Sequence, residues 1–321
     1  SGKNYTATHT VVSGQNGIIQ NFSLSNFTDL VGNSGHTITS LTSGDSVTVD
    51  TIPPTLNLVS ISSNNSTTTL AKEGDIITLN INSSETISTP SISFDIGSKT
   101  VNPTVSGSGN SYTATYTVID GENGSVGNFS ISNFYDLSGN LGSTVTSLTN
   151  DTSITVDTIP PTLDVVTISS NNSISNLAKE GDIITLTINS SETITTPTIT
   201  FNIGNDNIIP TINGSGSNYT ATYTVINNQN GIIGDFSISN FSDLAGNSGA
   251  IVSSLTSGST VTVDTILPTL DLVTISSNNL ISTLAKEGDI ITLNINASET
   301  ISTPIISFDI GNDNIIPTIN G

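Results

Sequence analysis

The sequence predicts an all-β protein, in which antiparallel two-sheet sandwich domains of about seven strands are arranged end to end as a rod. Three observations predict this fold class. The chain repeats itself with a period of 107 residues, short runs of alternating apolar and polar residues fill each period, and turn-forming residues separate the runs. A period of this length is too long for a solenoid coil and suits one sandwich domain.

The repeat is visible in landmarks that keep one register. Tyr5, Tyr112 and Tyr219 begin the related segments YTATHTV, YTATYTV and YTATYTV, and no insertion or deletion separates the copies. Self-similarity at a fixed period indicates an array of structural units. The other landmarks are AKEGDIITL, which begins at Ala71, Ala178 and Ala285, and D-L-x-G-N, which begins at Asp29, Asp136 and Asp243.

Proline-containing linkers follow Asp50, Asp157 and Asp264 and give the expected domain boundaries. Two whole domains are expected at 51–157 and 158–264. Residues 1–50 then form the C-terminal half of a domain, and residues 265–321 form the N-terminal half of another. A half-domain cannot bury a core alone. We therefore expect a window of a longer array, or else halves from neighbouring chains that complete each other.

Within 158–264, Ile184, Leu186 and Ile188 alternate with threonines and are expected to point into the core. Outward threonine ladders are compatible with ice or sugar binding, but a solvated strand face explains them more simply. Strands are expected at 163–169, 182–189, 198–203, 208–212 (a short edge strand that carries Pro210) and 219–225, and around 236–238 and 261–263.

Composition excludes several functions. Five Lys and Arg against 26 Asp and Glu give a net charge of −21, so no surface of the chain suits a nucleic-acid backbone or anionic lipid. There is no cysteine, and the two histidines, His9 and His36, do not recur between copies. Nucleophilic, metallohydrolase and nucleotide chemistry therefore lack their usual residues, and we predict a protein that is not an enzyme.

The ordered motifs P-T-L, L-A-K-E-G-D-I-I-T-L, S-E-T-I, Y-T-A-T-Y-T-V, D-L-A-G-N and V-T-V-D-T-I together resemble the tandem bacterial immunoglobulin-like repeats of large cell-surface adhesins. The resemblance covers all three copies. It implies an immunoglobulin-like fold, display at the cell surface, a spacer role and, often, calcium at the domain joints. It says little about a ligand, because recognition in such proteins usually resides in other domains.

Fifteen of the 26 acidic residues occupy five positions that recur in every copy. Carboxylates that meet at a joint suit Ca²⁺, which takes six to eight oxygen ligands. The candidate ligands of an interdomain calcium ion are Asp29, Asp136 and Asp243; Asp50, Asp157 and Asp264; Glu73, Glu180 and Glu287; Asp75, Asp182 and Asp289; and Glu85, Glu192 and Glu299.

Sandwich topology predicts where these positions lie. Asp157, Glu192 and Asp243 are expected at the top of one domain, and Glu73 and Asp75 at the bottom of the domain before it. The simpler interpretation is that the acidic residues only form turns, of the Asx type in D-L-x-G-N and a tight turn at 180–182. No EF-hand string is present to decide between the two.

Lys72, Lys179 and Lys286 are the recurring cations. An internal Lys–Asn isopeptide bond is one interpretation, and a surface lysine paired with the adjacent glutamate is the simpler one. Each lysine flanks a turn, which favours the surface pairing.

The function predicted first is a non-catalytic extracellular stalk or fibre segment, which gives reach and tensile strength. Its partners would be further copies of the repeat in the same chain and, in a fibre, neighbouring chains. The second prediction is a self-assembling filament or surface-layer subunit with lateral contacts. The third, a carbohydrate- or surface-binding module, would need exposed aromatic residues, and only Tyr135 suits that role. No direct membrane insertion is expected.

Overall fold

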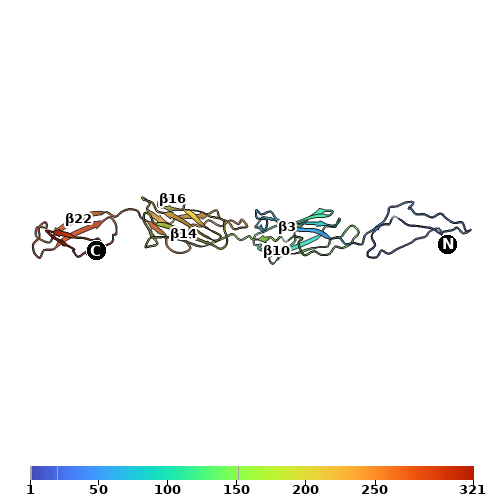
Figure 1. Ribbon diagram of the computed structural model, residues 1–321, viewed down its shortest axis with the longest axis horizontal. Helices are drawn as coiled ribbons and strands as arrows, with labels where there is room; N and C mark the ends of the chain where they lie inside the picture. Colours follow the sequence, from blue (N-terminus) through green and yellow to red (C-terminus); the bar gives the residue numbers. More distant parts are fainter. Residues whose placement is uncertain (1, 20, 151) are drawn as a thin grey trace.

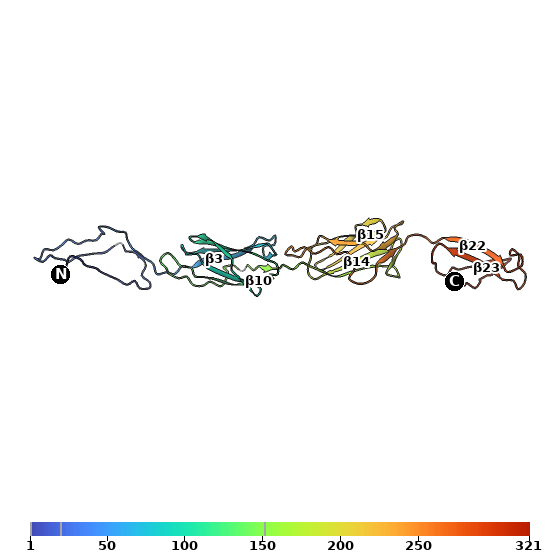
Figure 2. The ribbon, with the colours of Figure 1, turned by 180° about the vertical axis from the view of Figure 1, so that it is seen from behind.

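A computed structural model describes residues 2–19, 21–150 and 152–321. The chain is elongated, with its two termini at opposite ends and two compact β-units in the middle (Figures 1 and 2). All regular elements of the described residues are strands. None of these residues belongs to a helix with the length and apolarity that crossing a membrane requires.

The unit within 51–157 consists of two sheets that face each other (Figure 1). Its first sheet has the order β3-β5-β9-β8, with bounds Leu56–Ser63, Ile76–Ser83, Ser111–Thr117 and Thr104–Ser108. Its second sheet has the order β4-β11-β10-β6-β7, with bounds Leu70–Ala71, Thr155–Val156, Gly124–Ser132, Ser91–Ile96 and Lys99–Val101.

The unit within 158–264 repeats this arrangement. Its first sheet is β12-β14-β18-β17, with bounds Leu163–Ser170, Ile183–Ser190, Asn218–Thr224 and Thr211–Ser215. The opposite side consists of β13-β21-β19, at Leu177–Ala178, Val261–Val263 and Gly231–Ile233, and of β16-β15-β20, at Asp206–Ile208, Thr198–Ile203 and Phe236–Ser239.

These strand orders are those of an immunoglobulin-like sandwich. We letter the main strands of each unit A to G in chain order, leaving out the short strands β4, β7, β13 and β16 and taking β19 and β20 together as F. The first sheet of each unit is then A-B-E-D and the second side holds G, F and C, which is the immunoglobulin arrangement. The predicted all-β, immunoglobulin-like fold class is therefore confirmed. One feature that the sequence did not reveal is a two-residue strand, β4 or β13, which pairs in parallel with the last strand of its unit.

Each unit has its own core, because alternate residues of both sheets point inward. Ile184, Leu186 and Ile188 are at most 1% exposed, as the period-two pattern predicted. One core draws on residues between Val59 and Val156 and the other on residues between Val166 and Val263.

The predicted edge strand at 208–212 is wrong. The segment divides at Pro210, so that β16 ends at Ile208 in one sheet and β17 begins at Thr211 in the other. Proline has no backbone N–H to donate to a sheet, and the chain uses this position to change sheets.

The two end segments expose apolar side chains whose counterparts are buried in the complete units. Residues 2–50 contain only β1 (Gly17–Ile18) and β2 (Thr48–Val49) among those described, and residues 265–321 contain β22 (Leu270–Ser277), β23 (Ile291–Ala297), β24 (Phe308–Ile310) and β25 (Asp313–Ile315). Ile275 is 62% exposed, whereas its counterpart Ile168 is 7% exposed.

The two complete units differ in one buried polar network. In the first, Glu122 is 4% exposed and accepts hydrogen bonds from Lys99 Nζ (2.7 Å) and from Tyr116 Oη (2.6 Å). In the second, Gln229 takes the place of Glu122 and Asp206 that of Lys99, and Gln229 accepts the hydrogen bond from Tyr223 at 3.1 Å. Lys99 therefore occurs in the unit whose buried residue is the charged Glu122, and not in the unit with the neutral Gln229.

We expect Lys99→Ala to destabilise the first unit, because it leaves a buried carboxylate without its cation. The loss should be only about 1 kcal/mol at pH 7, since solvent partly screens the ion pair. Lys99→Ala with Glu122→Gln should recover most of this loss, since glutamine keeps the bond from Tyr116. Native-state hydrogen exchange of β9 and β10 measures the effect. Equal losses in the single and double variants would contradict this account.

The same network predicts a pH dependence. Burial raises the pKa of Glu122, but hydrogen bonds from Lys99, Tyr116 and the Ile119 N–H outweigh it and lower the pKa below its usual value of 4.5. A lowered folded-state pKa stabilises the unit above about pH 4.5, and this contribution is lost as the pH falls further. Glu122→Gln should remove the contribution, which hydrogen exchange at pH 7 and pH 4 would measure.

Candidate metal centre

Three carboxylates from distant parts of the chain meet at the top of each complete unit. Asp157, Glu192 and Asp243 each place a carboxylate oxygen so that all three atoms lie within 4.8 Å of one another. Asp50, Glu85 and Asp136 form the same group one period earlier. We call each group an acidic triad. In each triad the last member is buried and the other two are half-buried.

Backbone contacts at the top of the sandwich position the triad. Glu192 lies in the β14–β15 connection and Asp243 in the β20–β21 connection, and the Thr195 N–H donates to the Ser242 carbonyl at 2.8 Å between them. Asp157 comes from the linker that enters the unit. The Asn247 side chain donates to the Asp157 carbonyl at 2.8 Å and to Asp243 Oδ2 at 2.7 Å.

The D-L-x-G-N motif forms the Asx-type turn that the sequence suggested. Asp243 Oδ1 accepts the Gly246 N–H at 2.7 Å and the Asn247 N–H at 2.9 Å. The turn also holds the linker in place, because the Asn247 side chain donates a hydrogen bond to the Asp157 carbonyl. In the preceding unit Asn140 makes the same bond to the Asp50 carbonyl at 3.1 Å.

Like charges meet in the triad. Burial raises the pKa of Glu192, and the charges of Asp157 and Asp243 raise it further. The pKa of Glu85 is raised for the same reasons, by burial and then by Asp136 and Asp50. Burial also raises the pKa of Asp136, but hydrogen bonds from Asn140 and from backbone N–H groups outweigh it, so that the pKa is lowered. In both triads, charge repulsion therefore adds to burial in raising the pKa of the glutamate.

The donor set suits a hard divalent cation. Three carboxylates offer oxygen ligands, which Ca²⁺ prefers, and water or carbonyl groups would have to complete its shell. Asp157 Oδ1 accepts the Ile159 N–H at 3.0 Å. From the residues that the structure describes, no hydrogen bond reaches Asp157 Oδ2 or either carboxylate oxygen of Glu192, so these atoms are available as ligands.

The remaining predicted ligands lie outside the two triads. Asp75, Asp182 and Asp289 each accept a side-chain bond from an asparagine in their own unit, at 2.6, 2.7 and 2.7 Å. Glu73, Glu180 and Glu287 are exposed on the adjacent turn. Asp29 caps its own turn by accepting from Asn33, and Asp264 and Glu299, the counterparts of Asp157 and Glu192, are exposed.

The sequence did not single out the asparagines of the joint. Asn140 and Asn247 hold the linker, and Asn65 donates to the carbonyl of Ala245 in the following unit at 2.9 Å. Asn140 and Asn247 were visible as the last residue of the recurring D-L-x-G-N motif. Asn65 is one of many asparagines in a chain rich in them, and only the fold shows which one reaches a neighbour.

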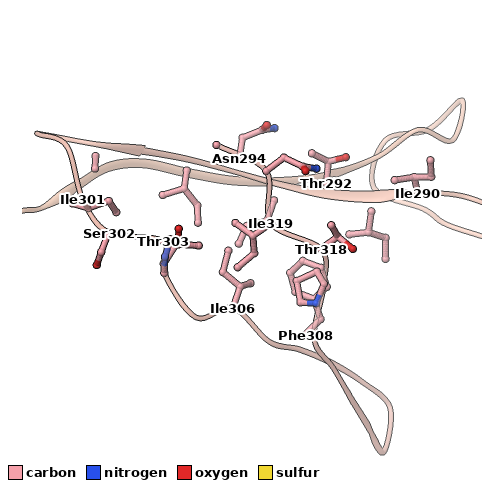
Figure 3. A pocket seen from close by; sticks show the side chains of 18 residues that line it. Ile290, Thr292, Asn294, Ile301, Ser302, Thr303, Ile306, Phe308, Thr318 and Ile319 are labelled. Carbon is pink, nitrogen blue, oxygen red and sulfur yellow. The ribbon is translucent and has the colours of Figure 1, made fainter.

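A separate hollow lies in the C-terminal segment. An open groove of about 820 Å³ runs along β23 and is lined by Leu293, Ile295, Ile306, Phe308 and Ile319 among others. Figure 3 shows Ile306, Phe308 and Ile319 on one side of the strands that cross the picture. In the complete units the counterpart of this face is the covered core of the sandwich.

No protein-family model matches the sequence, and no curated protein matches it either. Among solved structures, the chain is similar to the I9–I11 tandem of titin, at 7% identity and a TM-score of 0.28, over 68% of this chain and 79% of the other. It is also similar to the D1–D4 ectodomain fragment of ICAM-5, at 14% identity and a TM-score of 0.27, over 81% and 74%. At such scores the assignment of the fold rests on the strand orders.

Repulsion within the triad gives a testable expectation. A raised folded-state pKa means that the charged Glu192 destabilises its unit as the pH rises above the usual 4.5. Without divalent cations, Glu192→Gln should stabilise that unit by a few tenths of a kcal/mol to about 1 kcal/mol at pH 7. The gain should vanish below pH 4. Hydrogen exchange of β14 measures it, with β5 of the other unit as the internal reference.

Proposed function

We propose that the chain is a segment of an extracellular stalk or fibre, without catalytic activity, in which immunoglobulin-like units give reach between a cell and its target. One observation carries the proposal: two complete units of one repeat stand in line, and the linker between them is fixed by hydrogen bonds to the following unit (Figure 1). A linear array needs such joints, since a flexible linker would let the units fold back on one another.

The resemblance to the repeats of large bacterial surface adhesins supports the finer part of the proposal. It gives the chain an extender role and a place at the cell surface. The high negative charge fits a solvated, non-aggregating surface of this kind, and the chain carries no cysteine whose oxidation would matter outside the cell.

Calcium at the joints completes the proposal. A Ca²⁺ ion held by Asp157, Glu192 and Asp243 would neutralise the like charges of the triad and bridge the linker to two loops of the unit it enters. Asp50, Glu85 and Asp136 would do the same one unit earlier. The ion would then stabilise both the unit and its angle to the linker, whereas chelation would restore the repulsion.

The test compares the chain in calcium and in chelator. Saturating calcium should raise the melting temperature by several degrees, since ligand at 100 times Kd stabilises by about 2.7 kcal/mol, and should lengthen the particle in small-angle X-ray scattering. Glu85→Gln with Glu192→Gln should weaken both responses. Glu73→Gln with Glu180→Gln changes the charge equally at exposed positions and serves as the control. Equal responses in both double variants would refute calcium binding at the triads.

The open groove supports a second candidate, a self-assembling filament. Residues 2–50 carry apolar side chains at the positions that cover this face in a complete unit: Phe22, for example, corresponds to Phe129 and Phe236, which are 8% and 7% exposed. A second copy of the chain could therefore supply the strands that the groove of the first copy receives, and the chains would join head to tail.

Sedimentation of the full chain over a range of concentrations tests this candidate. Head-to-tail joining should give species that grow with concentration, and Phe22→Asp should abolish them because a charge cannot enter an apolar core. Leu30→Asp is the matched control, since Leu30, Leu137 and Leu244 are all more than 60% exposed. A single monomeric species at every concentration would exclude the filament.

A further inference from the structure

A side chain of the first complete unit donates a hydrogen bond to the backbone of the second. Asn65, in the β3–β4 connection of the first unit, donates from Nδ2 to the Ala245 carbonyl in the second unit at 2.9 Å. Both residues are buried, at 8% and 4% exposure. A hydrogen bond in such surroundings is shielded from water, so losing it leaves a buried carbonyl without its donor.

The amide of Asn65 is oriented by its own unit before it meets the next one. Asn65 Oδ1 accepts the Thr67 N–H at 2.9 Å, and Nδ2 donates its other hydrogen to Asp75 Oδ2 at 2.6 Å. These two bonds decide which end of the amide is the donor. The second N–H then points out of the unit, toward Ala245.

The same oriented amide recurs in the other copies. Asn172 donates to Asp182 and Asn279 to Asp289, both at 2.7 Å. Among the described residues no following loop lies over either asparagine, and both are only half-buried. The contact with the second unit therefore accounts for the burial of Asn65.

The receiving loop recurs in the same way. Ser138 is the counterpart of Ala245, and it is exposed, with no corner like that of Asn65 lying over it among the described residues. Gly246, at φ +92°, shapes the loop, and Lys72 lies against it: its Cε would be 3.5 Å from a Cβ at that position. Lys72 is half-buried, whereas Lys179 and Lys286 are exposed.

We propose that these two surfaces form a latch that joins each unit to the next copy of the repeat. The latch consists of the Asn–Asp–Lys corner at the bottom of one unit and the D-L-x-G-N loop at the top of the following one. The corners at Asn172 with Lys179 and at Asn279 with Lys286 are thus docking surfaces for the D-L-x-G-N loop of another copy. The acceptor is a carbonyl, which explains why position x varies among Val31, Ser138 and Ala245 while its neighbours do not.

The latch and the acidic triad hold different parts of the joint. The triad connects the linker with the loops of the unit that it enters, whereas the latch connects that unit with the preceding one. The hydrogen bond of the latch needs no metal ion, because a neutral amide donates to a neutral carbonyl. The proposal rests on the proposed array for its further copies, but the joint between the two complete units tests it directly.

Because the chain lacks cysteine, spin labels can be placed at will. Thr104→Cys with Thr211→Cys puts one label at an exposed, equivalent strand position of each unit. Double electron–electron resonance on the full chain, in chelator, should give one narrow distance distribution. Asn65→Ala should broaden it, since losing one ordinary hydrogen bond lowers the ratio of latched to open joints roughly fivefold.

Two matched pairs complete the test. Asn172→Ala removes the bond to Asp182, which corresponds to the bond from Asn65 to Asp75, but it leaves the joint between the two complete units intact. The distance distribution of this variant should therefore stay narrow. Ala245→Glu should broaden the distribution because Ala245 is buried at the joint, whereas Ser138→Glu should not because Ser138 is exposed. This pair tests the latch if Asn65→Ala fails to fold. A narrow distribution in Asn65→Ala, or equal broadening in Asn65→Ala and Asn172→Ala, would overturn the latch.

Repeating the measurement in calcium separates the latch from the calcium proposal. If calcium leaves the wild-type distribution unchanged while Asn65→Ala broadens it, the latch stands and calcium stiffening fails. If the distribution is narrow only in calcium and Asn65→Ala has no effect, the latch fails.

Discussion

The arrangement of the joint depends on the hydrogen bond from the Asn247 side chain to the Asp157 carbonyl. This bond fixes the linker against the unit that it enters, and the Asp157 carboxylate is thereby carried to Glu192 and Asp243. The same asparagine closes the D-L-x-G-N turn on Asp243, so that the turn which presents the Ala245 carbonyl to Asn65 is also anchored. One amide group therefore positions both the acidic triad and the receiving side of the proposed latch.

Two opposing forces meet within a short distance at this joint. Like charges in the triad favour separation of the linker from the loops, and after burial they are the second cause of the raised pKa of Glu192. The hydrogen bonds of Asn247 and Asn65 favour contact. The hydrogen bonds keep the joint closed, but its stability depends on the charge of the triad. A change in that charge alters the repulsion between linker and loops and leaves the hydrogen bonds in place.

Much of the fold followed from the sequence because its causes are local. Alternation of apolar residues predicted strands such as β14 and β18, and the unbroken register indicated an array of similar units. The division of the edge strand at Pro210 and the short strand β13 escaped prediction, since both depend on which sheet the chain joins. The network of Glu122 was also missed: Lys99 occurs in one copy only, and only the fold shows that the lysine meets a buried glutamate.

The candidate site was predictable in part for the same reason. Topology was enough to bring Asp157, Glu192 and Asp243 to one end of a unit, but it did not separate them from Glu73 or Asp75, which recur equally often. What distinguishes the two sets is the convergence of carboxylate oxygens in the fold. Asp157, Glu192 and Asp243 bring theirs within 4.8 Å of one another, whereas Asp75 accepts a bond from Asn65 and Glu73 is exposed on a turn.

The parallel pairing of the shortest strands has a mechanical consequence. β4 lies beside β11, with the Thr155 and Asp157 N–H groups donating to the Thr69 and Ala71 carbonyls at 2.9 and 2.8 Å. When a chain is pulled from its two ends, parallel neighbours slide along each other, and their bonds bear the load together instead of opening one after another. β13 and β21 repeat the geometry, with bonds of 2.9 Å from Thr262 and Asp264. In the proposed stalk, each unit would therefore hold these bonds in shear beside the point where force passes to the next linker.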